Sequence, residues 1–173
     1  MTLILETRTL HWPDEAATET AAQALARSPE LMPALILLEG GLGAGKTTWV
    51  RHLLRALGVT GRIKSPSYAV LESYAPPAGP VHHFDFYRFS DPREWEDAGF
   101  REILAGEGLK LVEWPEHAEG LLPQADLRLQ IQDEAAEHVE GQVFGDIEGE
   151  GRRSVSAQAL SPRGRALLQA LAA

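Results

Sequence analysis

Eight residues, from Gly40 to Thr47, constrain this 173-residue chain more than any other segment. They read GGLGAGKT and satisfy the pattern G-x-x-x-x-G-K-[ST]. Glycines let the backbone curl so that successive N–H groups point inward, and the positive end of a following helix adds to the attraction for an anion. In this pattern Lys46 reaches the β- and γ-phosphates, and Thr47 offers its hydroxyl to Mg²⁺. The segment therefore predicts a site for ATP or GTP with Mg²⁺.

The residues around this loop have the context that the pattern requires. Before it, Ala34 to Leu38 form a short apolar run, typical of a strand buried on both faces. After it, apolar residues recur at helical spacing from Val50 to Leu57, and Gly58 follows as a stop signal. The order strand, glycine loop, helix is the one in which such a loop binds phosphate.

Further strands and helices alternate along the chain. The strands expected beyond 34–38 are 2–10, 68–74, 81–86, 109–112, 127–131 and 139–147. Helices are expected to start near Pro13, at Ser90 or Asp91, and at Ser161-Pro162. This alternation predicts a three-layer α/β sandwich with a mixed, mostly parallel sheet. We expect one domain over residues 1–173, with a core in 1–150 and a C-terminal extension in 151–173 that carries a helix.

Composition narrows the classes of function. The net charge of −9 argues against a general nucleic-acid binder, because phosphate contacts need a surplus of Lys and Arg. It suits an enzyme of small molecules or a subunit that docks on a basic partner. The chain has no cysteine, which excludes disulfides and thiolate metal sites and fits a reducing cytoplasm. No signal peptide or apolar run of membrane-spanning length is evident, so no membrane partner is expected.

A second acid near Mg²⁺ is expected at the end of a neighbouring buried strand. Leu109 to Val112 lead directly to Glu113, and Trp114-Pro115 then end the strand. Glu113 is therefore the best candidate for the second metal contact. The alternative is a solvated Glu at a strand end.

Two other segments carry polar groups that could act near the phosphates. Ser65 to Tyr68 follow the expected loop helix, where a hydroxyl can sense a γ-phosphate. On spacing alone, an ordinary Ser-Pro turn is the better interpretation of this segment. Asp85 lies among aromatic residues at a strand end, where a carboxylate could hold the attacking water. The alternative is an ion pair with Arg88 that braces a turn.

The adjacent His82 and His83 point to opposite faces of a strand, so they are not expected to chelate a metal together.

Taken together, the motifs resemble the TsaE (YjeE) family, the ATPase of bacterial tRNA threonylcarbamoyladenosine biosynthesis. The matching segments run in order over about residues 12 to 131: Gly40 with 42–48 and Arg51, 65–68, 83–88, 91–92, 113–115 and 122–123. The ordered set with His83-Phe84-Asp85 and Glu113-Trp114-Pro115 is far more specific than the glycine loop alone.

The resemblance implies roles for individual residues. Lys46 and Thr47 would bind phosphate and Mg²⁺, with Glu113 as the second metal contact. The 65–68 segment would be the first switch of the family, Asp85 would lie in the second, and Pro13-Asp14-Glu15 would lie near the base. Two departures from the family pattern are Ser67, usually Thr, and Gly41, usually Asp; neither removes one of these roles.

The candidate site follows from the motif and the resemblance together. The expected catalytic residues are Lys46, Asp85 and Glu113, and the expected metal ligands are Thr47 and Glu113. The expected ATP-binding residues are Glu15, Gly41, Leu42, Gly43, Ala44, Gly45, Lys46, Thr47, Thr48 and Ser67.

The resemblance also implies partners and a substrate. Family members act with TsaB and TsaD, and TsaD transfers the threonylcarbamoyl group to adenosine 37 of tRNAs that read codons beginning with A. The acidic balance argues that tRNA is held mainly by those partners. Two rival functions stay open on the residues alone: a small-molecule kinase, which would need an arginine-bearing lid that we do not find, and a nucleotide-dependent binding module without hydrolysis.

Overall fold

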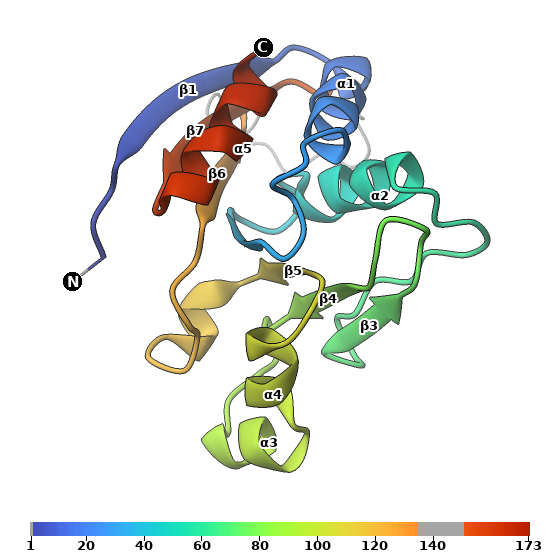
Figure 1. Cartoon of the computed structure of the whole chain (residues 1–173), viewed down its shortest axis with the longest axis vertical. Helices are drawn as coiled ribbons and strands as arrows, with labels where there is room; N and C mark the ends of the chain where they lie inside the picture. Colours follow the sequence, from blue (N-terminus) through green and yellow to red (C-terminus); the bar gives the residue numbers. More distant parts are fainter. Residues whose placement is uncertain (1, 135–150) are drawn as a thin grey trace, which may run out of the picture.

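The computed structural model describes residues 2–134 and 151–173, which form an α/β fold around one mixed sheet (Figure 1). Its strands are β1 (Glu6–Trp12), β2 (Leu35–Glu39), β3 (Leu71–Tyr74), β4 (Val81–Asp85), β5 (Leu109–Glu113), β6 (Leu127–Asp133) and β7 (Arg153–Ala159). Its helices are α1 (Glu15–Ala26), α2 (Lys46–Ala56), α3 (Pro92–Asp97), α4 (Phe100–Ala105) and α5 (Pro162–Ala172), with a 3₁₀ turn, η1, at Pro115–Ala118.

The seven strands lie in the order β1-β7-β6-β2-β5-β4-β3. The four middle strands, β6, β2, β5 and β4, are parallel to one another, whereas β1, β7 and β3 pair antiparallel. The α/β class and the mixed sheet are confirmed. The expectation of a mostly parallel sheet is wrong for the described strands, since three of their six pairings are antiparallel. At one flank the cause is local: β3 and β4 are joined by the short segment 75–80, and strands joined by so short a connection pair antiparallel.

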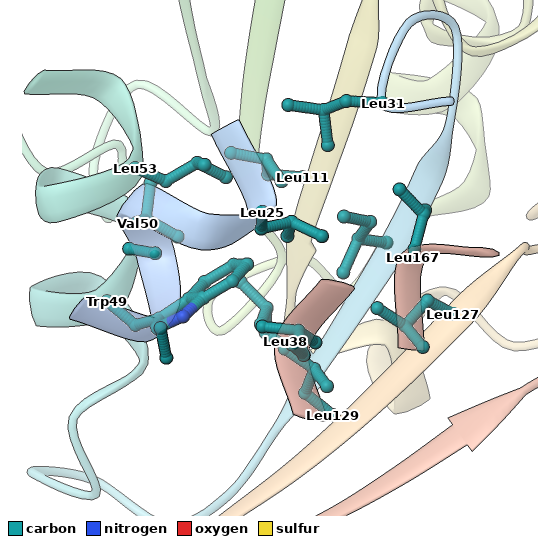
Figure 2. Close-up of a cluster of buried hydrophobic side chains, with 14 of the residues drawn as sticks. Leu25, Leu31, Leu38, Trp49, Val50, Leu53, Leu111, Leu127, Leu129 and Leu167 are labelled. Carbon is teal, nitrogen blue, oxygen red and sulfur yellow. The ribbon is translucent and has the colours of Figure 1, made fainter. Parts of the chain in front are cut away.

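Helices cover both faces of the sheet, and the sheet therefore divides the hydrophobic core into two clusters. Along β2, Ile36 and Leu38 belong to one hydrophobic cluster, and Leu35 and Leu37 belong to the other. The first cluster packs the sheet against α1, α2 and α5; Figure 2 shows Leu38, Leu111, Leu127 and Leu129 of the sheet meeting side chains of these helices, such as Trp49, Leu25 and Leu167. The second cluster packs the sheet against α3 and α4 and is rich in aromatic rings. A continuous apolar strand such as β2 is what burial on both faces demands.

The main departures from the expected strands have local causes. The first strand begins at Glu6 and not at Thr2. The third begins at Leu71 and not at Tyr68, because the Val70 N–H bonds back to the Pro66 carbonyl at 2.6 Å and closes a turn. The strand expected at 139–147 lies outside the described residues.

Strand β7 was not expected from the sequence. Residues 153–159 read RSVSAQA, and the side chains of Val155, Ala157 and Ala159 are buried while the residues between them are partly exposed. The C-terminal segment therefore contributes a strand between β1 and β6 in addition to the expected helix, α5. Within the described residues no helix is long and apolar enough to cross a bilayer.

Asp126 ties this C-terminal segment to β2, the strand that leads into the glycine loop. Its Oδ2 accepts the Leu35 N–H at 2.9 Å, and its Oδ1 accepts the Ser161 hydroxyl at 2.7 Å. Ser161 in turn caps α5 by accepting the Gly164 N–H at 3.0 Å. The first turn of α5 lies so close to this corner that a Cβ on Gly164 would stand 1.8 Å from the Asp126 carbonyl oxygen.

We predict that Gly164→Ala lowers the free energy of unfolding by about 1–3 kcal/mol, the usual range for overpacking. Helix propensity alone predicts the opposite sign, a gain of about 1 kcal/mol. Urea denaturation distinguishes the two. Gln169→Ala, at an exposed position of the same helix, is the control and should change stability by less than about 0.5 kcal/mol. A stabilised Gly164→Ala variant would contradict the close contact.

Candidate functional site

A cavity of about 240 Å³ opens beside the first turn of α2, at the carboxyl ends of β4 and β5. Parallel strands end at the same edge of a sheet, and ligands of α/β proteins bind there. The cavity is lined by Leu42, Gly43, Ala44, Gly45, Lys46, Thr47, Thr48, Ser65, Ser67, Asp85, Tyr87, Glu113 and Trp114. The structure thus brings together ten of the twelve residues expected from the sequence. A larger cavity of about 380 Å³, which η1 and β6 help to line, contains none of them.

The glycine loop is shaped by close packing at its first residue. Gly40 has a φ of 149°, and a Cβ there would lie 2.4 Å from the Ile131 carbonyl oxygen of β6. The helix after the loop starts at Lys46, and no side chain caps it. Its first backbone N–H groups are therefore available to an anion, as in other helix N-termini that bind phosphate.

Lys46 is a buried cation at the floor of the cavity. Its ammonium donates to the Gly40 carbonyl and, at 3.2 Å, to the Gly41 carbonyl, and it lies 3.9 Å from the ring centroid of Trp114. Burial lowers the pKa of the Lys46 ammonium, and this effect is opposed mainly by the nearby carboxylates of Glu113, Glu116 and Asp85. A cation held at such a desolvation cost is suited to an anionic ligand.

Glu113 joins the loop helix to the sheet. Its Oε1 accepts the Thr47 hydroxyl at 2.9 Å, and its Oε2 lies 2.6 Å from Nε2 of the buried His83. Adjacent ligands about 2.05 Å from an octahedral Mg²⁺ lie about 2.9 Å apart. The hydroxyl of Thr47 and the carboxylate of Glu113 therefore fit two neighbouring positions around this ion. The alternative of a solvated strand-end Glu is wrong, because Glu113 is only 2% exposed.

Asp85 is the second carboxylate of the cavity and is also buried. Its Oδ1 accepts the Tyr87 N–H at 2.9 Å. Burial raises the pKa of Asp85, the backbone hydrogen bond opposes this shift, and the charge of Glu113 adds to it. Arg88 does not brace Asp85; its guanidinium lies 4.5 Å from the ring centroid of Tyr68 instead.

The 65–68 segment forms one side of the cavity mouth. The hydroxyls of Ser65 and Ser67 lie 2.8 Å apart, and both residues line the cavity. Tyr68 follows with 83% of its surface exposed. The segment thus presents hydroxyls inward and an aromatic ring to solvent.

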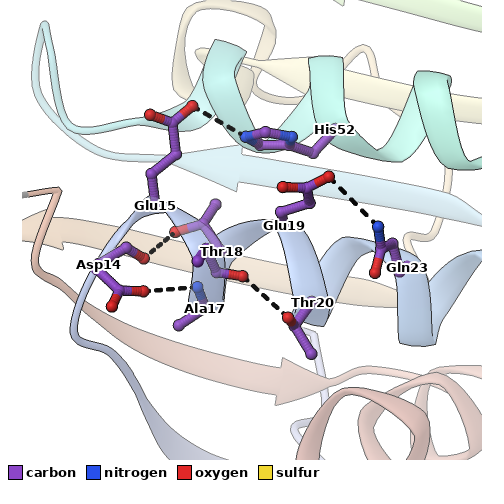
Figure 3. A network of polar contacts seen from close by, with 9 residues as sticks. Asp14, Glu15, Ala17, Thr18, Glu19, Thr20, Gln23 and His52 are labelled. Carbon is purple, nitrogen blue, oxygen red and sulfur yellow. Dashed lines mark hydrogen bonds and ion pairs between the residues drawn. The ribbon is translucent and has the colours of Figure 1, made fainter.

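Glu15 and Gly41 do not line this cavity. Glu15, in the first turn of α1, lies with Oε1 3.1 Å from Nε2 of His52 on α2, and Figure 3 shows this pair beside the capping contacts of Asp14. Gly41 lines a separate cavity of about 260 Å³ between the loop and the end of β6. The pairing of Glu15 with α2 could not be read from the sequence, since it depends on how the two helices pack.

Tyr87 lines the cavity although sequence reasoning did not assign it to the site. Other unassigned residues contact the site as well. Trp114 packs on Lys46, His83 contacts Glu113, and Arg153 of β7 lies against the loop, with its Nε 2.6 Å from where a Gly45 Cβ would stand. Arg153 is held by Asp133 at 3.2 Å. Strand alternation carried the signal for His83, because it lies two residues before Asp85 and so faces the same way. Arg153 could not be found without β7.

Comparison with known proteins gives a consistent result. The family model described as "Threonylcarbamoyl adenosine biosynthesis protein TsaE" matches residues 12–141. The chain is 36% identical over 131 residues to the tRNA threonylcarbamoyladenosine biosynthesis protein TsaE of Haemophilus influenzae, covering 73% of this chain and 83% of the relative. It is 38% identical over 123 residues to TsaE of Bacillus subtilis, covering 70% of this chain and 77% of the relative.

A solved structure has the same fold. The crystal structure of Bacillus subtilis YdiB superimposes with a TM-score of 0.68 at 25% identity, over 99% of this chain and 97% of that one. The family match extends well beyond the glycine loop and includes the 83–88 and 113–115 segments that shape the cavity. The chain belongs to the TsaE family of tRNA threonylcarbamoyladenosine biosynthesis proteins.

Proposed function

We propose that this protein is a P-loop ATPase that binds ATP with Mg²⁺ and hydrolyses it weakly. The observation that carries the proposal is the 2.9 Å contact between the Thr47 hydroxyl and the Glu113 carboxylate. It puts two oxygen ligands from distant parts of the chain together, next to a buried lysine and an uncapped helix N-terminus. A structural ion-binding role would not require the phosphate-binding elements beside it.

In this proposal each group has a separate task. Lys46 and the N–H groups at the start of α2 bind the β- and γ-phosphates. Thr47 and Glu113 hold Mg²⁺, which, when bound, neutralises the charge that develops on the phosphate oxygens. Asp85 orients the attacking water and accepts its proton, for which a carboxyl with a raised pKa is suited.

The wider role follows from the family. We propose that hydrolysis supports threonylcarbamoylation of adenosine 37 in tRNAs that read codons beginning with A, in a cytoplasmic complex with proteins like TsaB and TsaD. The net charge of −9 favours contact with tRNA mainly through those partners. Phosphate release, measured with this protein alone and with the partners, tests the proposal; faster release in the complex supports it.

The same assay separates the rival functions. Neither rival releases phosphate: a nucleotide-dependent binding module leaves ATP intact, whereas a small-molecule kinase forms ADP only when an acceptor takes the phosphoryl group. The buried Asp85 in the cavity favours hydrolysis over passive binding, because its burial is a cost that a binding module would not need.

We predict that Lys46→Ala weakens ATP binding by about 10- to 100-fold, because a hydrogen bond to a charged group contributes roughly 1.5–3 kcal/mol. Titration calorimetry with ATP and Mg²⁺ measures the change. Lys110→Met is the matched control: Lys110 is also buried, but its ammonium bonds to the Gly106 carbonyl, away from the cavity. Unchanged affinity in Lys46→Ala would contradict the phosphate role.

We predict that Asp85→Asn lowers the rate of hydrolysis by about 100-fold, within the range for loss of a general base, and changes ATP affinity by less than about 3-fold. Asn keeps the acceptor for the Tyr87 N–H. Single-turnover kinetics and equilibrium binding measure the two quantities separately. Hydrolysis that stays near the wild-type rate would remove Asp85 from the mechanism.

The same variant should also be more stable than the wild type at neutral pH. The raised pKa means that folding disfavours the ionised carboxylate, a cost that is present at pH 7 and disappears as the pH falls below the unfolded value near 3.8. Since Asn does not ionise, the stability difference between Asp85→Asn and wild type should shrink as the pH falls. Urea denaturation across this pH range measures it, and a variant less stable than wild type at pH 7 would contradict the cost.

A further inference from the structure

Both oxygens of the Glu113 carboxylate have their own donor. On one side the Thr47 hydroxyl donates to Oε1 at 2.9 Å, and on the other Nε2 of His83 lies 2.6 Å from Oε2. His83 is 1% exposed, so this contact is buried away from bulk solvent. The plane of the carboxylate is therefore fixed at two points.

The surroundings of the other ring nitrogen show whether His83 donates a hydrogen bond to Glu113 or accepts one. Nδ1 of His83 is buried and has no hydrogen-bond partner among the described residues. A neutral ring with its proton on Nε2 donates to Glu113 and leaves only a lone pair at Nδ1, whereas the other tautomer would bury an N–H without an acceptor and face a lone pair against the carboxylate. The ring is thus a donor to Glu113.

The sheet explains why this residue reaches the site and its neighbour does not. Parallel pairing of β4 with β5 sets Asp85 opposite Glu113. His83 precedes Asp85 by two residues and faces the same side, while His82 faces the other side and contacts the Ser73 hydroxyl at 2.8 Å. His82 is therefore a natural control for His83.

We propose that His83 is a positioning residue for the metal site: it holds the Glu113 carboxylate in the orientation that turns Oε1 toward Thr47. The inference rests on the proposed Mg²⁺-nucleotide function of this cavity. Without the donor, Oε2 would be a buried anionic oxygen with no partner, and the carboxylate could turn about its terminal torsion, which has only broad preferences. Loss of a hydrogen-bond partner behind a metal ligand typically weakens metal binding by about 10- to 100-fold.

The test uses Mn²⁺ as a probe of the metal site. The full-length protein is saturated with a non-hydrolysable ATP analogue, and the paramagnetic resonance signal of free Mn²⁺ measures its dissociation constant. We expect His83→Leu to raise this constant about 10- to 100-fold. His83→Gln, which keeps an N–H near the Nε2 position, and the control His82→Leu should each stay within about 3-fold of wild type. Affinity for the analogue in EDTA should be unchanged in all three.

The outcomes separate this inference from the function on which it rests. If the wild type itself binds no Mn²⁺ with the analogue, the proposed function fails. If the wild type binds Mn²⁺ and His83→Leu binds it equally well, the positioning role fails while the function stands. If His83→Gln loses as much as His83→Leu, or if His83→Leu also loses affinity in EDTA, His83 acts through packing and the inference is overturned.

Discussion

Parallel pairing between β2 and β5 places the glycine loop beside Glu113, and the other groups of the site lie around this pair. The register sets Leu38 opposite Glu113, so the strand that enters the glycine loop and the strand that ends in the carboxylate finish side by side. Thr47, which follows the loop, then meets Glu113 at 2.9 Å although 66 residues separate them in the chain. The next parallel pairing brings Asp85 to the same edge. The glycine loop, Glu113 and Asp85 therefore lie close together, because β2, β5 and β4 are parallel and end at the same edge of the sheet.

The buried charged groups of the site lower the stability of the folded state, and burial of the apolar core offsets this cost. Burial lowers the pKa of Lys46 and raises that of Asp85, so both side chains are held in surroundings that disfavour their charged forms. Nδ1 of His83, which is buried and has no hydrogen-bond partner in the described part of the chain, adds a desolvation cost. Against these stand two apolar clusters, one on each face of the sheet, which include the fully buried Trp49 and Trp95. Desolvated charges supported by a rigid core are typical of a functional site.

Sequence reasoning succeeded where the signal is local. The order of β2, the glycine loop and α2 lies within about two dozen residues and carries its own periodicity. Glu113 likewise follows a short, mostly apolar run and stands directly before Trp114-Pro115. The residues that the loop needs are therefore found from the pattern alone. The 83–88 and 113–115 segments further indicated the TsaE family, and the comparisons confirm this family.

What was missed depends on packing between distant segments. Strand β7 has small, mixed residues whose inward positions are Val155 and two alanines, too weakly apolar to predict a strand. Without β7, the contact of Arg153 with the loop could not be foreseen. The pairing of Glu15 with His52 likewise follows from helix packing and not from spacing. For His83, strand alternation indicates the side that it faces, but its contact with Glu113 depends on the pairing of β4 with β5.

In the proposed site, Thr47 and Glu113 form the metal end of a nucleotide-binding cavity. A crystal structure with a non-hydrolysable ATP analogue and Mn²⁺, located by its anomalous scattering, tests it directly. We expect an anomalous peak next to the Thr47 hydroxyl and the Glu113 carboxylate, with the phosphates on Lys46. A nucleotide bound elsewhere, or a metal ion remote from Glu113, would contradict it.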